Sequence, residues 1–460
     1  MKADIDKIKD MENIFMIAPA GCGKTETIAD IIGSKEQVKK YLILTHTNAG
    51  VECISKRLRK KKISSKQYQI YTIASFCYKY VNAYPRLSKM ENINKSDYNE
   101  TYKGMTNLLK NKHIQRVLVN TYNQVLIDEY QDCTKLQHNL IVTLSKIIPC
   151  KLFGDPLQGI FGFRDKLVNW DEVKNDFVYA GTFEYPWRWE KHNKQLGNWI
   201  MQVRRKLINN EDIYLSNLPF GIEWIYNDDN GVNLVKKANE LLSSQEEKLI
   251  LFQLPSQAHQ FAQKMGGKYF SQEEVECKEL RNIARYIEDN NTITSIYEMA
   301  KICFTQFNIQ LGTIYKKIEN KESNFNRISK NKEVVKATLE AIQDNKYYRV
   351  IEEIEKIKAM KLYRRELWNE FKKLIREIQL HNEKNINEII DNIRNNSTLN
   401  NKYKYRNLVS RILLVKGLEF NTVVLVNPEK LNKELFYVAI SRPTNRLIIA
   451  SKNKKLNFSE

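Results

Sequence analysis

Short apolar runs alternate with amphipathic stretches from Ile14 to Ala180. The runs are rich in β-branched and aliphatic residues, whereas the stretches between them place apolar residues at the three- and four-residue spacing typical of helices. Strands that alternate with helices form a parallel sheet with helices on both faces, so we expect an α/β fold. The clearest strand candidates are FMIAP (Phe15–Pro19), YLILT (Tyr41–Thr45), QVLIDE (Gln124–Glu129) and KLFGD (Lys151–Asp155).

The same alternation returns in the second half of the chain. A strand pattern occurs at Glu247–Gln253, and its sheet is expected to resume at Asn421–Asn427 and Arg446–Ser451. Between residues 289 and 404 the apolar residues instead follow helical spacing within a highly charged background. We therefore predict a second sheet that is interrupted by an all-helical insertion.

Aromatic residues within this insertion admit two interpretations: an interface for a partner, or internal packing. Aromatic side chains at helical spacing most often build a core, so we favour internal packing. The residues concerned are Tyr347, Tyr348, Tyr363 and Trp368.

Composition adds a preference for anionic partners. The chain has 460 residues, too many for one hydrophobic core, and its 74 Lys+Arg against 54 Asp+Glu give a formal net charge of +20. Such a basic protein favours polyanions such as nucleic acids, although a lysine-rich genome would produce the same excess. Charge alone therefore leaves both explanations open.

Cysteine spacing and hydropathy indicate where the protein works. The seven cysteines form no C-x-x-C pair and have no histidine at zinc spacing, which argues against a metal cluster or a disulfide framework. The N-terminus lacks a signal pattern, and no apolar run is long enough to cross a bilayer. We expect a cytoplasmic protein without a membrane partner.

A glycine-containing segment after the first strand predicts a phosphate-binding loop. The segment APAGCGKT follows a strand and opens a helix, where backbone N–H groups and a helix N-terminus cradle phosphate oxygens. Lys24 is expected to reach the β- and γ-phosphates, and Thr25 to bind Mg²⁺. The predicted nucleotide-binding residues of this loop are Ala18, Pro19, Ala20, Gly21, Cys22, Gly23, Lys24 and Thr25.

Two adjacent carboxylates complete the predicted catalytic site. Asp128 and Glu129 end the apolar run QVLI, which places them at the carboxyl edge of a parallel sheet, facing the phosphate loop. A cation that bridges phosphates needs oxygen ligands, and in-line attack needs a base beside the water. We therefore assign Mg²⁺ binding to Asp128 and activation of the attacking water to Glu129.

Beyond these residues, an ordered series of segments resembles the superfamily 1A helicases of the UvrD/Rep type. The likeness extends over nearly the whole chain outside the helical insertion. It rests on the phosphate loop together with THTNAG (Thr45–Gly50), YTIASF (Tyr71–Phe76), IDEYQD (Ile127–Asp132), GDPLQGIFGFR (Gly154–Arg164), YPWRW (Tyr185–Trp189), VKGLEF (Val415–Phe420) and YVAISR (Tyr437–Arg442).

The resemblance implies further residues around ATP. Arg442 looks like an arginine finger that a second motor domain supplies to the γ-phosphate, with Arg188 as its companion. Positive charge that arrives with domain closure couples hydrolysis to motion. The other implied nucleotide contacts are the γ-phosphate sensors Gln131 and Gln158, the adenine-stacking Trp187, and Gly417 with the ribose contact Glu419.

The resemblance also implies an aromatic path for DNA. Phe161 and Phe163 match side chains that stack on successive bases, and His46 stands where a stacking phenylalanine is usual. Stacking contributes about 1–3 kcal/mol per base and tolerates any sequence, which suits a translocating protein. The remaining expected DNA contacts are Thr45, Asn48, Ser75 and Arg164.

Two RecA-like P-loop motor domains with helical insertions follow from the resemblance. The expected boundaries are 1–77 and 114–184 for motor domain 1A, 78–113 for a small insertion 1B, 185–288 and 405–460 for motor domain 2A, and 289–404 for a helical insertion 2B.

The leading functional hypothesis is a DNA-dependent ATPase, with ATP and Mg²⁺ as cofactors, that moves 3′ to 5′ on single-stranded or partly duplex DNA. The alternative is a regulatory ATPase that senses DNA ends or nucleotides for a nuclease and unwinds little. In its size, and in the lack of a glutamine before the phosphate loop, the chain is similar to the compact helicase subunits of antiviral systems such as Gabija. That similarity implies a partner nuclease of the overcoming-lysogenization-defect (OLD) family.

Overall fold

The computed structural model describes residues 7–8, 10–34, 38–90, 97–162, 165–228, 230–274, 277–380, 385–400 and 405–458, the side chains of residues 395–400 excepted. Internal contacts divide the chain into two compact units. Unit 1 comprises Met1–Gly221, Leu431–Asn445 and Lys455–Glu460, and unit 2 comprises Ile222–Lys430 and Arg446–Lys454.

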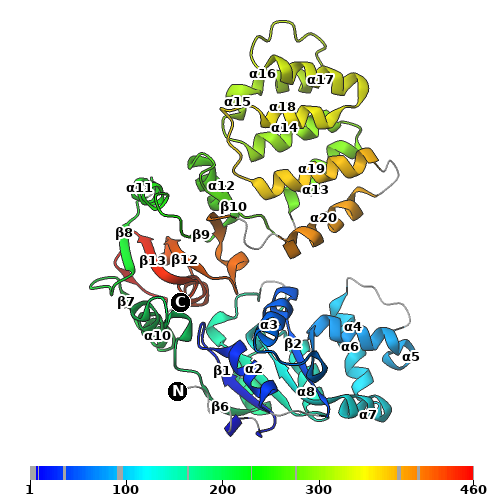
Figure 1. Ribbon diagram of the computed structural model, residues 1–460, viewed down its shortest axis with the longest axis vertical. Helices are drawn as coiled ribbons and strands as arrows, with labels where there is room; N and C mark the ends of the chain where they lie inside the picture. Colours follow the sequence, from blue (N-terminus) through cyan, green and yellow to red (C-terminus); the bar gives the residue numbers. More distant parts are fainter. Residues whose placement is uncertain are drawn as a thin grey trace. The chain divides into compact units, whose positions relative to one another are not determined.

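Unit 1 is built on a six-stranded sheet whose paired strands run parallel, in the order β3-β2-β4-β5-β1-β6. Figure 1 labels β1, β2 and β6 of this sheet together with helices of the same unit. Ile17 pairs with Gly154, and Ile127 pairs with Leu152, so β1, β4 and β5 end at the same edge. The loops after these strands are therefore neighbours. The strands are β1 (Ile14–Ile17), β2 (Lys40–Thr45), β3 (Tyr68–Thr72), β4 (Tyr122–Ile127), β5 (Cys150–Gly154) and β6 (Val178–Thr182).

Two hydrophobic cores cover the two faces of this sheet. Phe15 and Leu152 face a core shared with α4, α6 and α8, whereas Ile14 and Phe153 face a core shared with α2 and α3. Successive strand residues alternate between the cores, because neighbouring side chains of a strand point to opposite faces. The helices of unit 1 are α2 (Lys24–Gly33), α3 (Asn48–Lys60), α4 (Ile73–Ala83), α5 (Pro85–Ser88), α6 (Tyr98–Leu109), α7 (Lys112–Thr121), α8 (Lys135–Ser145), α9 (Trp170–Asp176), α10 (Lys194–Ile208) and α21 (Lys433–Ile440).

Short elements complete unit 1. Thr134 caps α8 with a capping box to Gln137, which satisfies backbone N–H groups at the start of the helix. Strands β7 (Ile213–Tyr214) and β14 (Lys455–Leu456) form a small antiparallel pair. The 3₁₀ turns are η1 (Ser65–Gln67), η2 (Tyr130–Asp132), η3 (Pro156–Gln158) and η4 (Trp187–Trp189).

Unit 2 contains the second six-stranded sheet, in the order β10-β11-β9-β12-β13-β8. Strands at Glu247–Gln253, Asn421–Asn427 and Arg446–Ser451 were expected and correspond to β9, β12 and β13, so the sheet resumes after the helices as predicted. Two helices, α11 (Val232–Leu241) and α12 (Pro255–Lys264), accompany it, with 3₁₀ turns η5 (Ile412–Val415) and η6 (Pro428–Lys430). The strands are β8 (Ile222–Tyr226), β9 (Lys248–Phe252), β10 (Phe270–Ser271), β11 (Asn407–Arg411), β12 (Phe420–Val426) and β13 (Pro443–Ser451). The predicted α/β fold with two parallel sheets, as in paired RecA-like domains, is thus confirmed.

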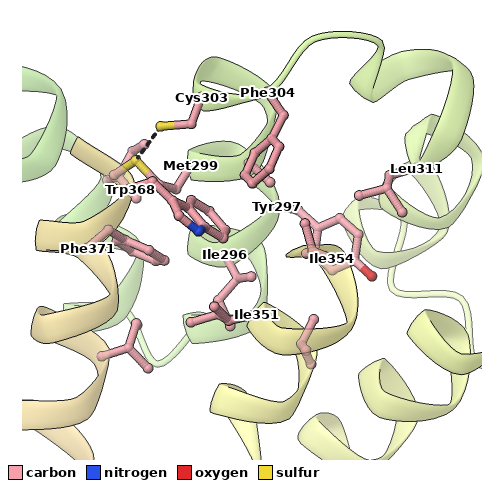
Figure 2. Packing of buried hydrophobic residues seen from close by; sticks show 14 of the residues in the cluster. Ile296, Tyr297, Met299, Cys303, Phe304, Leu311, Ile351, Ile354, Trp368 and Phe371 are labelled. Carbon is pink, nitrogen blue, oxygen red and sulfur yellow. Dashed lines mark hydrogen bonds between the residues drawn. The ribbon is translucent and has the colours of Figure 1, made fainter. Parts of the chain in front are cut away.

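A helical body with its own core occupies the interval between β10 and β11. Trp368 is fully buried and meets Phe304 edge to face, at 4.9 Å between ring centroids. Figure 2 shows Trp368 beside Phe371 inside this core, with the Met299 sulfur directed toward that of Cys303. The helices are α13 (Lys278–Glu288), α14 (Thr292–Cys303), α15 (Phe307–Gln310), α16 (Gly312–Glu319), α17 (Lys332–Asp344), α18 (Tyr347–Glu355), α19 (Arg365–Leu380) and α20 (Ile386–Asn400).

Internal packing of the aromatic residues is confirmed for Trp368 and for Tyr363, which is buried and donates its hydroxyl to the carbonyl of Ile302. Tyr347 packs against the core at its edge. Tyr348 differs, because 37% of it is exposed.

One buried ion pair connects the helical body to the chain near β10, and another joins α20 to α19 within the body. Arg364 forms a two-pronged pair with Glu273, and Arg394 donates to both oxygens of Glu370 at 2.7 Å. Glu366 lies within 3.4 Å of Arg394. Burial first, and the neighbouring Glu370 second, raise the pKa of Glu366 to about 7, although Arg394 opposes them. This carboxyl therefore titrates close to neutrality.

The structure also bears on cysteine chemistry and membranes. All seven cysteines are free, and six of them are buried. In the described ranges, no three or more His, Cys, Asp or Glu side chains are grouped as a metal site would require. None of the helices in that part of the chain combines the length and apolar character needed to cross a membrane.

Candidate functional site

The phosphate loop joins β1 to α2 at the carboxyl edge of the first sheet. Its backbone requires glycine twice, because Gly21 and Gly23 have φ angles of 72° and 89°, in the left-handed region. A Cβ atom on Gly21 would lie 2.7 Å from the ring of Trp189, so the loop is also closely covered. Lys24 then starts α2. The loop has the concave backbone and the helix N-terminus that bind phosphate.

Lys24 meets both predicted catalytic carboxylates. Its Nζ forms an ion pair with Glu129 and lies 3.2 Å from Oδ1 of Asp128. Burial alone would lower the pKa of Lys24, but the two carboxylates outweigh it and raise the pKa. Burial raises the pKa of Asp128, and Lys24 partly opposes this shift. The three side chains thus form one cluster in which the lysine offsets the carboxylate charge.

A magnesium ion fits this cluster. Oδ1 of Asp128 is buried and accepts no hydrogen bond of good geometry from the described residues, so it can turn a lone pair to a cation. Thr25 follows Lys24 in the first turn of α2, where a hydroxyl can serve as a second oxygen ligand. Mg²⁺ typically takes few protein ligands and completes its shell with water and substrate phosphates.

The backbone at Glu129 is strained. Its φ of 57° lies in the left-handed region, where a non-glycine residue costs about 1–3 kcal/mol. The next residue, Tyr130, is fully buried and its hydroxyl lies 2.7 Å from Nδ1 of His138. Nε2 of His138 lies 3.0 Å from a carboxylate oxygen of Asp176. This chain of contacts fixes the turn that aims the Glu129 carboxylate.

Two glutamines surround the carboxylates. Gln131 donates to Glu129 and accepts from the backbone N–H of Asp155 at 3.1 Å, and Gln158 donates to Asp155 at 3.2 Å. Arg204 of α10 donates to Asp155 at 2.8 Å, and both side chains are buried. Neither Asp155 nor Arg204 was predicted from the sequence. The motif segment that begins at Gly154 offered a signal for Asp155, whereas Arg204 stands on a helix without a motif.

The WRW turn covers the phosphate loop. The backbone N–H of Arg188 donates to the Gly21 carbonyl at 3.0 Å. Trp187 is 43% exposed, and its ring lies 3.2 Å from where a Cβ on Gly23 would stand. An exposed aromatic face beside a phosphate loop is suited to stacking on a nucleotide base. Trp189, by contrast, is fully buried and serves packing.

Helix α21 brings the YVAISR segment against the same loop. The backbone N–H of Ala20 donates to the Tyr437 hydroxyl at 3.1 Å, and Arg188 donates to the Ser441 carbonyl at 2.6 Å. Arg442 is buried, and its guanidinium donates to the Val438 carbonyl and the Ser441 hydroxyl at 2.8 and 2.7 Å. Tyr437 was not predicted as a loop contact, although it begins the recognised motif.

The division by contacts therefore groups α21 with unit 1, whereas the predicted boundaries assign residues 405–460 to a single motor domain. Those boundaries stay a prediction. Gly417 and Glu419 belong to unit 2, in the turn between η5 and β12, where Gly417 has a φ of 83°. Their contact with nucleotide stays a prediction as well.

Those of the predicted DNA-binding residues that the structure describes share the carboxyl edge of the first sheet. Thr45 ends β2 and is buried, while Nε2 of His46 lies 3.4 Å from the Cys133 sulfur. Asn48 starts α3, and the exposed Ser75 donates to the Thr72 carbonyl at 3.0 Å near the start of α4. Phe161, after β5, is partly exposed. The other two predicted contacts, Phe163 and Arg164, lie outside the described residues.

Known proteins are similar to parts of the chain. The family model of the UvrD/REP helicase N-terminal domain matches residues 6–112 and 86–177. The exonuclease/helicase protein RexA of Lactococcus lactis subsp. cremoris (strain MG1363) is 26% identical over 168 residues, which are 34% of this chain and 14% of that protein. The RecBCD enzyme subunit RecB of Buchnera aphidicola subsp. Schizaphis graminum is 29% identical over 143 residues, 30% of this chain and 11% of that protein.

A solved structure of an arterivirus helicase, nonstructural protein 10 with DNA, aligns with 95% of this chain and 60% of its own. Its TM-score of 0.38 and sequence identity of 10% are too low to bear on function. The matched relatives are much longer than the parts that align. The family model and these relatives show that part of the chain, residues 6–177 by the family model, is similar to the N-terminal domain of UvrD/REP helicases.

Proposed function

We propose that the protein is an ATP-dependent translocase or helicase that moves 3′ to 5′ along single-stranded DNA. The observation that carries this proposal is the cluster of Lys24, Asp128 and Glu129 beside a glycine-bent phosphate loop. A lysine that neutralises phosphate, a metal-binding aspartate and a base for water are the groups that phosphoryl transfer requires. The direction of movement follows from the family resemblance.

In the proposed reaction, the water oxygen attacks the γ-phosphorus and the bond to the β–γ bridging oxygen breaks. Glu129 accepts the proton of the attacking water, and Gln131, hydrogen-bonded to Glu129, orients both. Lys24 stabilises charge on the phosphate oxygens. A magnesium ion held by Thr25 and Asp128 would supply further positive charge.

On the DNA side, we assign the edge that carries His46, Ser75 and Phe161 to single-stranded DNA. It is the same carboxyl edge that carries the catalytic residues, because β2, β4 and β5 are parallel neighbours in the sheet. A change at the phosphate loop can therefore be transmitted over a short distance to bound bases. Phe161 would stack, and Ser75 would contact the backbone.

Hydrolysis of ATP by two variants tests the proposal. Lys24→Ala and Glu129→Gln should each remove DNA-stimulated hydrolysis of ATP, measured by phosphate release with single-stranded oligonucleotides. Glu184→Gln is the matched control, because Glu184 is an exposed glutamate. Turnover near the wild-type rate in either catalytic variant would contradict the mechanism.

A second candidate function is a regulatory ATPase in a nuclease complex. It is favoured by the relatives, among which RexA is named for an exonuclease/helicase enzyme. In the finer form of this proposal, the partner is an OLD-family nuclease and the complex acts in antiviral defence. The regulatory function is supported if the purified chain hydrolyses ATP in response to DNA but displaces no strand. Failure of the two proteins to co-elute during size-exclusion chromatography contradicts the named partner.

A further inference from the structure

A basic groove lies on unit 1 at the ends of α6, α7 and α8. It has a volume of about 550 Å³, and its lining includes Lys110, Lys112, Arg116 and Lys146. All four side chains are exposed. Figure 1 labels the three helices, α6, α7 and α8, in unit 1.

The groove lies at the sheet edge opposite the phosphate loop. Helix α7 ends at Thr121 and leads into the amino end of β4, whose far end carries Asp128. Lys146 directly follows α8, before β5 begins at Cys150. Strands β4 and β5 are parallel, so both helix ends belong to the amino edge of the sheet. The site is therefore distinct from the nucleotide and DNA edge described above.

The charges in this groove are uncompensated. The lining residues include no carboxylate, and among the described residues none of the four cations has an ion-pair partner. Lys135, at the other end of α8, does form such a pair, with Glu172 at 2.8 Å. Like charges that share a groove repel one another, so this arrangement favours a bound anion.

The spacing of the groove side chains along α7 suits a polymer that carries one anionic group in each repeat. Lys112, Arg116 and Asn120 follow one another at four-residue intervals along α7, so they lie on one face and span about 12 Å. Successive phosphates of one DNA strand rise by about 3.4 Å along a duplex, so this face can reach more than one phosphate. Lys146 adds a cation from the facing helix end.

The lining also indicates the form of the nucleic acid. It includes no aromatic side chain, so the groove cannot stack on unpaired bases. Lysine, arginine and amide groups are the side chains that contact phosphates without reading sequence. A duplex presents its phosphates outward and keeps its bases inside. We propose that this groove binds the sugar–phosphate backbone of duplex DNA, as a second contact that extends the proposed translocase function and rests on it for the choice of DNA.

Matched double variants test this site in the full-length chain. Lys112→Ala with Arg116→Ala removes two charges from the groove, and Lys373→Ala with Arg376→Ala removes the same residue types from the exposed face of α19. Binding of a fluorescent blunt duplex of about 20 base pairs is measured by anisotropy over a series of KCl concentrations. The groove variant should bind about 10-fold more weakly at low salt and lower the slope of log K against log salt by about 2.

The control pair should keep the wild-type slope, and hydrolysis of ATP with single-stranded DNA should be unchanged in both. Lys146→Ala, a substitution outside any helix, provides a milder second variant with a slope change of about 1. Equal slopes for groove and control variants would overturn the proposal. So would displacement by polyglutamate without measurable duplex binding, which would identify an acidic protein segment as the ligand. Because the assay needs no ATP, loss of hydrolysis in the wild type would contradict the translocase and leave this test intact.

Discussion

At the residue scale, the site depends on a few side chains whose positions are fixed by their neighbours. Glu129 keeps a left-handed backbone because Tyr130 is anchored beside it by His138. Such strain persists only where the surrounding structure fixes it, and it is common at catalytic sites. The carboxylate of Glu129 is thereby held against Lys24 before any substrate binds. This pre-organisation lowers the reorganisation needed at the moment of reaction.

Replacement of Arg442 by alanine should slow turnover more than it weakens nucleotide binding. If Arg442 turns from its present acceptors to the γ-phosphate, it acts chiefly in the transition state, and its loss costs a factor of about 10³ or more in kcat. Phosphate release gives kcat, and a fluorescent nucleotide gives the affinity. Arg446→Ala, on an arginine paired with Glu223, is the control. Normal turnover of the Arg442 variant would remove the arginine-finger assignment.

Trp187→Ala should raise the KM for ATP while kcat changes little. The exposed ring is predicted to stack on the base, and loss of one stacking contact of about 1–3 kcal/mol corresponds to a rise of roughly 5- to 150-fold. Trp187→Phe keeps an aromatic face and should restore most of the affinity. Steady-state kinetics with ATP and GTP measure both effects. An unchanged KM in the alanine variant would show that the ring does not contact the base.

At the element scale, α21 and the helical body show two ways of attaching distant parts of the chain. Helix α21 attaches to unit 1 through Tyr437 and Ser441, which bond the phosphate loop and the WRW turn. The helical body attaches to the rest of unit 2 through the buried pair of Arg364 with Glu273 and through the bond that Arg394 donates to the Glu274 carbonyl. Buried pairs are costly to break, because one charge is left without compensation. Because Glu366 lies beside Arg394 and its pKa is raised to about 7, the attachment of the helical body should respond to pH.

Stability should fall as the pH rises through the titration of Glu366. Its pKa in the folded protein is about 7, whereas an unfolded glutamate has a pKa of about 4.3. Between these values the unfolded chain releases a proton that the folded chain retains, so ionisation favours unfolding. The cost is absent below about pH 4.3, grows up to about pH 7 and then stays constant, at on the order of 3–4 kcal/mol.

Glu366→Gln removes this titration and keeps an oxygen that can accept from Arg394. Thermal unfolding at several pH values should show the variant more stable than the wild type at pH 8, with the difference vanishing near pH 4.5. Glu388→Gln, on an exposed glutamate of α20, should follow the wild-type curve. A constant difference between the Glu366 variant and the wild type at every pH would refute the assignment.

At the scale of the whole molecule, two α/β units and a net charge of +20 suit a protein that handles DNA. The proposed direction of movement predicts a preference between substrates. A duplex with a 3′ single-stranded tail should be displaced with ATP, and the same duplex with a 5′ tail should not. Gel analysis of labelled strands measures both. Equal displacement, or a preference for the 5′ tail, would contradict the direction carried over from the family.

The sequence predicted which side chains would meet at the candidate site, because these residues stand in local patterns. A glycine-bent loop after a strand, and two carboxylates at the end of another, were readable from residue types and spacing, and the structure brings Lys24, Asp128 and Glu129 into contact. Strands β9, β12 and β13 were readable from apolar runs. Strand β10 was not, because its two residues carry no pattern, and it exists only by pairing with β11.

Tertiary structure alone decided the contacts between segments far apart in sequence. Arg204 and Asp155 are 49 residues apart, and Tyr437 is 417 residues from Ala20, so no local spacing relates them. The basic groove likewise arises only where one face of α7 and the end of α8 meet. Local sequence determines which groups are available and which conformations they prefer. Packing of the whole chain determines which of those groups share a site, because burial and pairing depend on neighbours that local sequence does not specify.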